Sequence, residues 1–280
     1  MNNSTLLMLL MIIQVINVKQ ALAVEYLPVE DNVAYSAVTA LDYAQPDEQV
    51  NYGDDPLQTA SVWFAHQPTG SEQKLLLLIH GGCWLNAYDI KHTYALSTAL
   101  AQAGYTVWSL EYRRTGDVGG GWPGSLEDIE SGIHRLETYS KKSFSLKNTV
   151  LIGHSAGGHL ALLAGGKRAQ LRAVIGLAAI TDIAEYSVGQ NSCQQVTKQF
   201  MGGAATDKPE EYKLANPLAQ PLHSHTILLQ GDADNIVPLA QAVALNVPVV
   251  MQQNAGHFDW VHPGTQAFQT LLIQLDKAFK

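Results

Sequence analysis

The sequence has few cysteines, no run of basic residues and no long hydrophobic segment, and each shortage excludes a class of protein. Two cysteines among 280 residues, Cys83 and Cys193, are too few for a disulfide-rich scaffold or a cysteine zinc site. With 17 Lys and Arg against 25 Asp and Glu, the net charge is -8, and no basic stripe is available for nucleic acid or anionic lipid. We therefore expect no metal, no cofactor and no nucleic-acid partner.

The most hydrophobic stretch, residues 6–18, is too short to span a membrane, which takes about 20 apolar residues. It has the length of a signal-peptide core, and Ala21-Leu22-Ala23 supplies an A-x-A cleavage site, although no basic residue precedes the core. The sequence thus predicts a leader over 1–23, a mature chain of 24–280, and export to the periplasm or the medium. The alternative is an uncleaved anchor lying at the membrane surface. We expect no stable membrane insertion once the leader is removed.

A hydrophobic content of 46% predicts one domain with a large core. From Lys74 onward, short apolar runs alternate with helical segments, a pattern typical of a mostly parallel sheet covered by helices on both faces. The expected strands lie at 60–65, 74–80, 105–111, 149–152, 172–179, 226–230 and 247–251, with 45–56 as a connection. Helices are expected over 92–103, over 125–142 with a capping box at Ser125 and Asp128, and over 264–280.

The sequence G-H-S-A-G at 153–157 lies between an apolar strand-like run and an Ala/Leu-rich helical run. A serine at such a junction sits on a sharp turn, and the flanking glycines let its hydroxyl project from the top of the sheet. The turn also places Ser155 at a helix N-terminus, where N–H groups favour a developing negative charge. We interpret Ser155 as a nucleophile; an ordinary Gly/Ser turn is the alternative.

A serine nucleophile needs a base that is itself oriented by a carboxylate. Asp234 follows the strand at 226–230, and Asp232 in the same loop is its rival. His257 follows the last expected strand, with His262 in reserve. These residues occur in the chain order Ser, Asp, His that this architecture uses.

Two backbone donors are also required for the oxyanion that forms during attack on a carbonyl. The N–H of Ala156, directly after the nucleophile, is the first. The loop after the strand at 74–80 supplies the second, from Gly82 or Cys83. Trp84 and His154 beside these motifs are candidate substrate-binding residues, although Trp84 also fits a core position and His154 a local hydrogen bond.

Residues 181–222 have weak periodicity and lie between two core strands, which predicts a cap or lid over the site, or alternatively a pair of surface helices. Cys193 lies inside this segment. A disulfide between Cys83 and Cys193 would join the oxyanion loop to the cap, and two free thiols are equally compatible with the sequence.

Together these residues resemble the α/β-hydrolase superfamily from about Lys74 to the C-terminus, and most closely its esterase/arylformamidase-like branch (BD-FAE-like), which is related to prolyl oligopeptidase catalytic domains. The matching segments are H-G-G-C-W at 80–84, E-Y-R-R at 111–114, G-G-G-W-P-G at 119–124, G-H-S-A-G-G-H at 153–159, F-M-G-G at 200–203 and A-N-P-L at 215–218. Cys83 departs from hormone-sensitive-lipase-type enzymes, which have a glycine at that position.

The resemblance implies an α/β-hydrolase fold, the triad Ser155, Asp234 and His257, and an oxyanion hole of Gly82 or Cys83 with Ala156. It further implies hydrolysis of small acyl esters, either as free small molecules or linked to polysaccharide. An arylformamidase or small peptidase could use the same triad, and a non-catalytic binding module of this fold is the remaining alternative. The oligomeric state is not indicated by the sequence.

Overall fold

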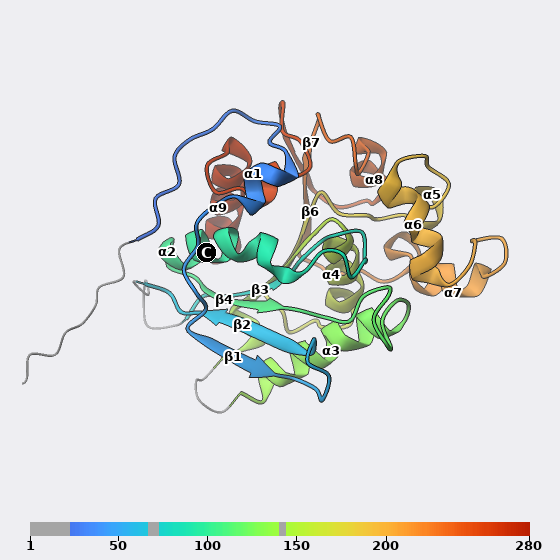
Figure 1. Cartoon of the computed structure of the whole chain (residues 1–280), viewed down its shortest axis with the longest axis horizontal. Helices are drawn as coiled ribbons and strands as arrows, with labels where there is room; N and C mark the ends of the chain where they lie inside the picture. The colour runs from blue at the N-terminus through green and yellow to red at the C-terminus, as the bar shows by residue number, and fades with distance from the viewer. Residues whose placement is uncertain (1–22, 67–72, 140–143) are drawn as a thin grey trace, which may run out of the picture.

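The computed structural model of the protein describes residues 23–66, 73–139 and 144–280, and its centre is one eight-stranded sheet (Figure 1). The strand order is β1-β2-β4-β3-β5-β6-β7-β8, in which β3 to β8 run parallel and β1 and β2 are antiparallel additions at one edge. The strands are β1 (Glu48–Asn51), β2 (Thr59–Trp63), β3 (Leu75–Ile79), β4 (Thr106–Leu110), β5 (Thr149–His154), β6 (Ala173–Leu177), β7 (Thr226–Gly231) and β8 (Val249–Gln252).

Helices cover both faces of this sheet, with α2 and α9 packed on one face and α3 and α4 on the other (Figure 1). The strand order reverses at β3, so the right-handed crossovers on its two sides place their helices on opposite faces. The helices are α1 (Tyr35–Thr39), α2 (Tyr94–Gln102), α3 (Gly124–Glu137), α4 (Ala156–Gly166), α5 (Ile183–Tyr186), α6 (Ser192–Met201), α7 (Pro209–Leu214), α8 (Leu239–Ala244) and α9 (Gln266–Ala278), with 3-10 turns η1 (Ile90–Thr93), η2 (Leu146–Asn148), η3 (Pro217–Ala219) and η4 (Asp259–Val261).

The central strands are buried on both faces, as the apolar runs predict. Every residue of β3, β4, β5 and β6 is buried. Side chains alternate between the two faces along a strand, so Leu75, Leu77 and Ile79 join the core under α3 and α4, while Leu76 and Leu78 join the core under α2 and α9. The predicted α/β architecture is confirmed, with each expected strand present within a few residues of its predicted ends.

The predicted capping box at the start of α3 is wrong. The helix begins at Gly124, so Ser125 lies inside its first turn, where its hydroxyl donates to the carbonyl of Arg113 (2.7 Å) and accepts from the N–H of Gly121 (3.2 Å). Asp128 accepts from the Arg113 guanidinium (2.6 Å) and cannot serve as a cap partner. The two polar groups therefore fasten the loop before α3, and the spacing matched a cap by coincidence.

The sequence also missed the edge strand β1, which lies in the expected connection at 45–56. Its register places Val50 opposite Ala60 and buries it, while its neighbours Gln49 and Asn51 stay on the outer side. Four residues with one buried side chain carry little periodic signal.

The predicted leader over 1–23 lies almost wholly outside the described residues, and no helix of the described ranges is long and apolar enough to cross a membrane.

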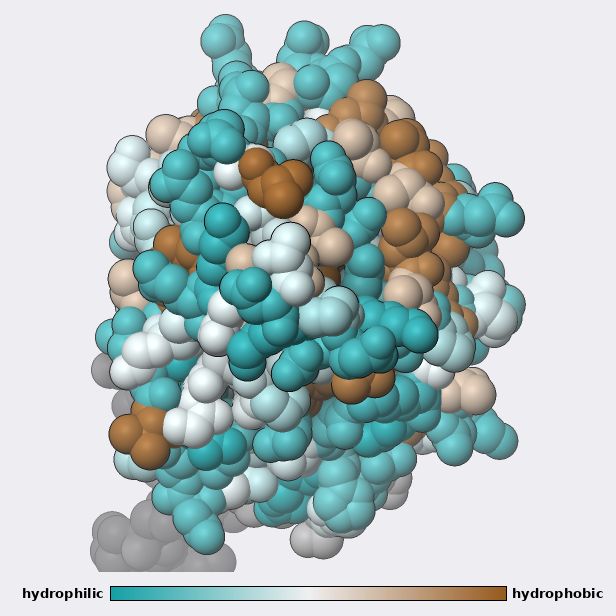
Figure 2. Space-filling model, turned by 90° about the vertical axis from the view of Figure 1, so that its right-hand side faces the viewer, coloured by the Kyte–Doolittle hydropathy of each residue, from teal (hydrophilic) through white to brown (hydrophobic). Residues whose placement is uncertain are grey.

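The segment 181–222 forms the short helices α5, α6 and α7, which gather at one side of the molecule (Figure 1). Their inner side chains belong to the main core, with Tyr186, Phe200 and Tyr212 almost fully buried. Figure 2 looks onto this side of the molecule, where most of the surface is hydrophilic and hydrophobic residues collect in a band toward one edge. The segment is thus an integral layer of the domain, and we refer to it below as the cap segment.

Candidate active site

Ser155 occupies the turn between β5 and α4 in a backbone conformation that few non-glycine residues adopt, with φ 57° and ψ -121°. Its N–H donates to the carbonyl of Leu177 on the neighbouring strand (2.8 Å), and its carbonyl accepts from His159 (3.0 Å) to begin the helix. The strand and the helix hold this strained turn from both sides. The predicted strand–serine–helix junction is therefore present.

The glycines around Ser155 are required by close backbone contacts. A Cβ on Gly153 would lie 2.1 Å from the carbonyl oxygen of Gly157, and a Cβ on Gly157 would lie 2.3 Å from the carbonyl oxygens of Ile79 and His80. No side chain fits at such distances. The two glycines thus let α4 start directly against β5 and bring the loop after β3 next to Ser155.

His257 and Asp234 lie on the loops that follow β8 and β7, at the edge of the sheet that also carries Ser155. Asp234 Oδ2 is 2.8 Å from His257 Nδ1. The other carboxylate oxygen, Oδ1, accepts from the N–H groups of Ile236 and Val237 (2.8 Å each), and the Gln230 side-chain amide donates to Oδ2 (3.2 Å). These donors hold the carboxylate still and direct one oxygen at the imidazole, which leaves His257 Nε2 free to act as a base.

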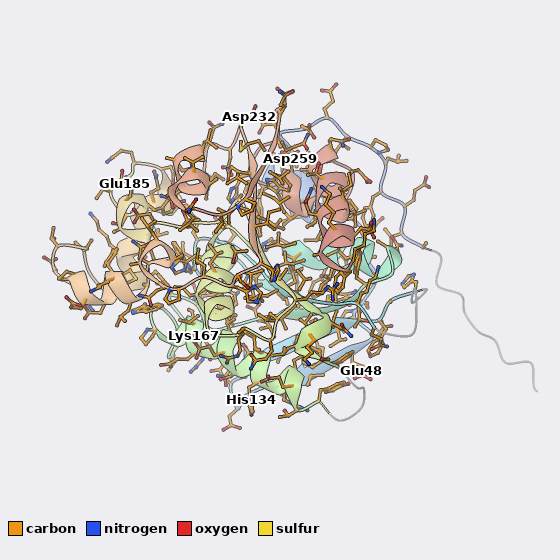
Figure 3. The ribbon with its side chains drawn as sticks, turned by 180° about the vertical axis from the view of Figure 1, so that it is seen from behind. Glu48, His134, Lys167, Glu185, Asp232 and Asp259 are labelled. Atoms are coloured by element: carbon orange, nitrogen blue, oxygen red, sulfur yellow. A yellow bond between two sulfur atoms is a disulfide. The ribbon has the colours of Figure 1, made fainter. Side chains whose placement is uncertain are left out.

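The two rival residues have other contacts. Asp232 is exposed at the rim of the sheet (Figure 3), where its carboxylate accepts from the N–H of Asn254 (2.6 Å). His262 Nδ1 accepts from the N–H of Gly264 (3.1 Å) and lies beyond η4. Neither lines the cavity described below, so the geometry favours Asp234 and His257.

The loop after β3 adopts positive φ at three successive residues, Gly82 (106°), Cys83 (52°) and Trp84 (57°). A Cβ on Gly82 would lie 2.4 Å from the Cβ of Tyr88, so only glycine fits there. In the described residues, the N–H groups of Gly82, Cys83 and Ala156 donate to no protein acceptor. The site therefore keeps a set of free backbone donors beside Ser155, as an oxyanion hole needs.

A buried ion-pair network lies behind this loop. His80 Nε2 is 2.9 Å from Glu111 Oε1, and His80 Nδ1 is 2.8 Å from the Gly81 carbonyl oxygen, so both ring nitrogens face acceptors. Arg114 Nη1 is 3.3 Å from Glu111 Oε1 and 2.6 Å from the carbonyl oxygen of Tyr88. Burial alone would raise the pKa of Glu111, but His80, Arg114 and the backbone donor together lower it. This network fixes the loop whose glycines face the site.

A cavity of about 170 Å³ opens beside Ser155 and His257. None of the described residues that line it is a Lys, Arg, Asp or Glu. Burial lowers the pKa of His154 well below its usual range and that of His92 to about 3, so both rings are neutral. Within the described ranges, no three His, Cys, Asp or Glu side chains come together as a metal-binding group. The cavity is lined by Tyr35, Gly82, Cys83, Tyr88, His92, His154, Ser155, Asn191, Ser192, Cys193, Ile236, His257 and Phe258.

The two predicted substrate-binding residues have different outcomes. Trp84 is fully buried, stacks on Phe200 (ring centroids 4.7 Å apart) and does not line the cavity, so its assignment to substrate binding is wrong and the core position is correct. His154 does line the cavity, and its Nε2 lies 2.9 Å from the carbonyl oxygen of His257. His154 therefore joins the serine turn to the histidine loop.

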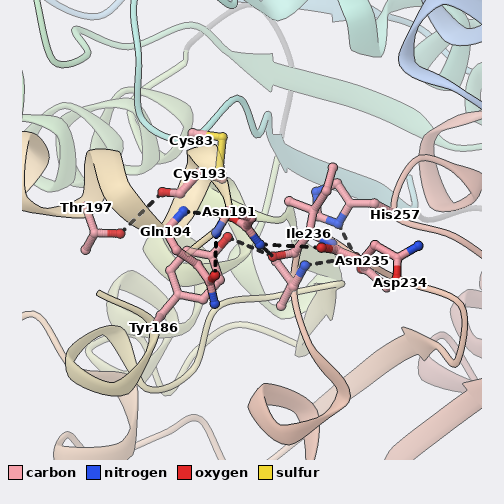
Figure 4. Close-up of a disulfide and its surroundings, with 11 residues drawn as sticks. Cys83, Tyr186, Asn191, Cys193, Gln194, Thr197, Asp234, Asn235, Ile236 and His257 are labelled. Atoms are coloured by element: carbon pink, nitrogen blue, oxygen red, sulfur yellow. Dashed lines mark hydrogen bonds and ion pairs between the residues drawn. A yellow bond between two sulfur atoms is a disulfide. The ribbon is translucent and has the colours of Figure 1, made fainter. Parts of the chain in front are cut away.

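The cap segment is attached to the site at several points (Figure 4). Cys83 of the loop after β3 and Cys193 of α6 form a disulfide, with their Cα atoms 5.3 Å apart. Asn191, the N-cap of α6, donates from its side chain to the carbonyl of Ile236 in the Asp234 loop (2.9 Å). His159 Nε2 is 2.6 Å from the carbonyl oxygen of Ala215. The pairing that the sequence left open is therefore present.

We expect the double variant Cys83→Ala/Cys193→Ala to lose about 4–5 kcal/mol of unfolding free energy, because the disulfide closes a loop of 110 residues in the unfolded chain. Urea unfolding of the parent and the variant measures the difference, and reductant should lower the unfolding midpoint of the parent alone. Equal midpoints for the parent with and without reductant would contradict the expectation.

A mostly parallel sheet, a serine on a strained strand–helix turn, and an acid and a histidine at the ends of later strands define the α/β-hydrolase fold. The chain belongs to the BD-FAE family, whose model matches residues 63–248. That match includes Ser155 and Asp234 but ends before His257, so the place of the histidine rests on the geometry above.

Among curated proteins, the chain is similar to esterase LipC of Mycobacterium tuberculosis, with 24% identity over 213 residues that cover 69% of this chain and 52% of LipC. It is also similar to kynurenine formamidase of Meyerozyma guilliermondii, with 29% identity over 113 residues that cover 40% of each chain. The chain thus spans about half or less of the length of these curated relatives.

Solved structures of esterases share the fold at low identity. Esterase B from Lactobacillus rhamnosus aligns with a TM-score of 0.71 and 20% identity, covering 87% of this chain and 89% of esterase B. A truncated carbohydrate esterase from gut microbiota aligns with a TM-score of 0.67 and 20% identity, covering 84% of this chain and 99% of that one. At this identity the likeness extends to the fold alone.

Several residues at the site could not be found from the sequence. Tyr35, Tyr88 and Phe258 line the cavity although none lies in a motif with a known chemical role. Glu111 belongs to a segment that resembles the family, but nothing in its spacing indicates that it pairs with His80. Their roles depend on segments that meet only in the folded chain.

Proposed function

We propose that the protein is a serine hydrolase that cleaves carboxylic esters, with Ser155, His257 and Asp234 as its catalytic residues. The observation that carries the proposal is the 2.8 Å contact between Asp234 Oδ2 and His257 Nδ1, behind a cavity that His257 shares with Ser155. Ser155 Oγ makes no hydrogen bond to a described residue. In serine hydrolases the hydrogen bond between the serine hydroxyl and the histidine often tightens only when substrate binds.

In the proposed reaction, His257 Nε2 takes the proton of Ser155 as Oγ attacks the ester carbonyl carbon. Asp234 keeps the proton on Nδ1 and stabilises the imidazolium that forms. The tetrahedral intermediate carries its negative charge on the former carbonyl oxygen, which the N–H groups of Ala156 and of Gly82 or Cys83 bind. His257 then protonates the departing alcohol, and a water molecule releases the acyl group by the same steps.

The surroundings of the site support the finer parts of the proposal. We assign 24–280 to one domain, in which the cap segment selects the substrate because the N-cap Asn191 and the first residue of α6, Ser192, contribute to the cavity wall. We assign 1–23 to an export leader, and the Cys83–Cys193 disulfide fits an oxidising compartment. None of the described wall residues is a Lys, Arg, Asp or Glu, which favours small uncharged acyl esters, free or linked to polysaccharide.

The second candidate is hydrolysis of an N-formyl or other amide bond by the same residues. The similarity to kynurenine formamidase, at 29% identity over 113 residues, is the observation that favours it. Against it, a formylated amino acid carries charged groups, and none of the described residues that line the cavity is a Lys, Arg, Asp or Glu that could pair with them. We therefore place ester hydrolysis first.

A substrate panel separates the two candidates. We expect the purified full chain near neutral pH to hydrolyse p-nitrophenyl acetate with a kcat/KM at least tenfold above those for N-formylkynurenine and for aminoacyl arylamides. The uncatalysed rate of each compound is subtracted. Hydrolysis of N-formylkynurenine at a higher kcat/KM than every ester would overturn the assignment and support the formamidase.

A further inference from the structure

The chain before β1 runs across the histidine loop. Residues 27–39, which we call the N-terminal strap, lie before the part of the chain that the family model matches. The N–H of Val29 donates to the carbonyl of Gly264 (3.0 Å), and the N–H of Gln266 donates to Asp31 Oδ1 (3.3 Å). In Figure 1 the strap arches over this end of the molecule and leads into α1. The strap is thus fastened to the segment that follows His257.

A buried carboxylate joins the strap to the histidine loop. Asp259 has no exposed surface, and its oxygens accept from the N–H of Asn32 (2.9 Å each) and of Val33 (3.4 Å) in the strap. The same carboxylate accepts from the N–H of Gly256 (2.5 Å), the residue directly before His257. One buried charge is therefore satisfied by both segments, and it couples their positions.

The strap then delivers a side chain to the cavity. Tyr35, the first residue of α1, lines the wall beside Ser155 and His257. Its ring centroid lies 5.3 Å from that of Phe258, 5.7 Å from that of Tyr88 and 5.8 Å from that of His92. These rings come from two other parts of the chain, the connection after β3 and the loop after β8, and with Tyr35 they form one aromatic wall. With a cavity of only about 170 Å³, this wall sets how much room is left for the bound ester.

We propose that Tyr35 is a specificity-determining residue that limits the size of the ester accepted at the site, and that Asp259 is the positioning residue that holds the strap and the His257 loop together. The inference rests on the proposed ester hydrolysis. Apolar pockets discriminate by the volume they leave open, so loss of the Tyr35 ring admits larger groups. Loss of the Asp259 charge releases the strap and has the same consequence through Tyr35.

The test measures kcat/KM for two ester series, p-nitrophenyl acetate to octanoate for the acyl group and methyl to benzyl acetate for the alcohol. Tyr35→Ala is expected to raise the large-to-small ratio at least tenfold in one series, whereas Tyr35→Phe, which keeps the ring, should keep the parental ratio. Tyr43→Ala is the matched control, because Tyr43 is an aromatic residue of the same N-terminal region that packs on Tyr94 away from the cavity. Parental ratios in both series for Tyr35→Ala would overturn the proposal.

Asp259→Asn tests the positioning role. We expect it to lower kcat and to shift the large-to-small ratio in the same direction as Tyr35→Ala. The double variant Tyr35→Ala/Asp259→Asn should change kcat and the ratio little further than the single variants do, because both substitutions act on the wall that the Tyr35 ring forms. Thermal unfolding identifies a variant that fails to fold. A folded Asp259→Asn with parental ratios, or full additivity with Tyr35→Ala, would remove the positioning role. If the parent itself hydrolyses no ester, the proposed function fails; if it does and the ratios never move, only this inference fails.

Discussion

Ser155→Ala is expected to lower kcat/KM for p-nitrophenyl acetate by about four to six orders of magnitude, to a rate near the background. The reason is that no other nucleophile is available at the junction of β5 and α4, where the free N–H groups are directed. The fold should survive, because the contacts that hold the turn are made by the backbone of Ser155. The measurement is steady-state hydrolysis near neutral pH with parent and variant side by side.

Ser192→Ala is the matched control for this variant. Ser192 also lines the cavity, but it is the first residue of α6 and lies outside the strand–helix turn that holds Ser155. We expect its effect on kcat/KM to stay within about tenfold. Equal rates for the parent and Ser155→Ala would contradict the serine mechanism, and a larger loss for Ser192→Ala would move the nucleophile to the cap segment.

Asp234→Asn is expected to lower kcat by roughly four orders of magnitude. The amide retains the size of the carboxylate, but it cannot both accept from His257 Nδ1 and stabilise the imidazolium. The N–H groups of Ile236 and Val237 hold Oδ1 in place, so the variant side chain should keep its position while losing its charge. Parallel assays of kcat across pH, with circular dichroism to check folding, measure the effect.

Asp232→Asn is the control that decides between the two carboxylates of this loop. Asp232 is exposed and accepts from the N–H of Asn254 at the rim of the sheet, so we expect a change in kcat of no more than a few fold. If Asp232→Asn proved more damaging than Asp234→Asn, the assignment of the acid would be reversed.

Much of the fold could be predicted because its signals are local. The runs that became β3, β5 and β7 are apolar and short, and each is followed by a turn, so their place in a parallel sheet follows from a few neighbouring residues. The strained turn at Ser155 is likewise indicated by its two glycines and by the change from strand to helix pattern.

Other predictions failed because a residue type fits more than one environment. Trp84 stands beside the oxyanion loop and could have faced a substrate, yet the backbone turns it into the core against Phe200. Ser125 and Asp128 have the spacing of a helix cap, yet they form hydrogen bonds with Arg113 and Gly121 instead. In both cases a partner outside the motif itself decided the outcome.

The amino-acid order alone identified the candidate groups of the site, namely a serine at a strand–helix turn, an aspartate and a histidine on later loops, and a glycine-rich loop after β3. Only the folded chain determined which distant groups meet: Cys83 with Cys193 across 110 residues, and Asp259 with Asn32 across 227. Backbone preference and hydrophobic periodicity act over a few residues and can be recognised in sequence. Contacts between remote segments arise from packing, where many polar side chains could serve equally well until the sheet and its helices bring one pair together.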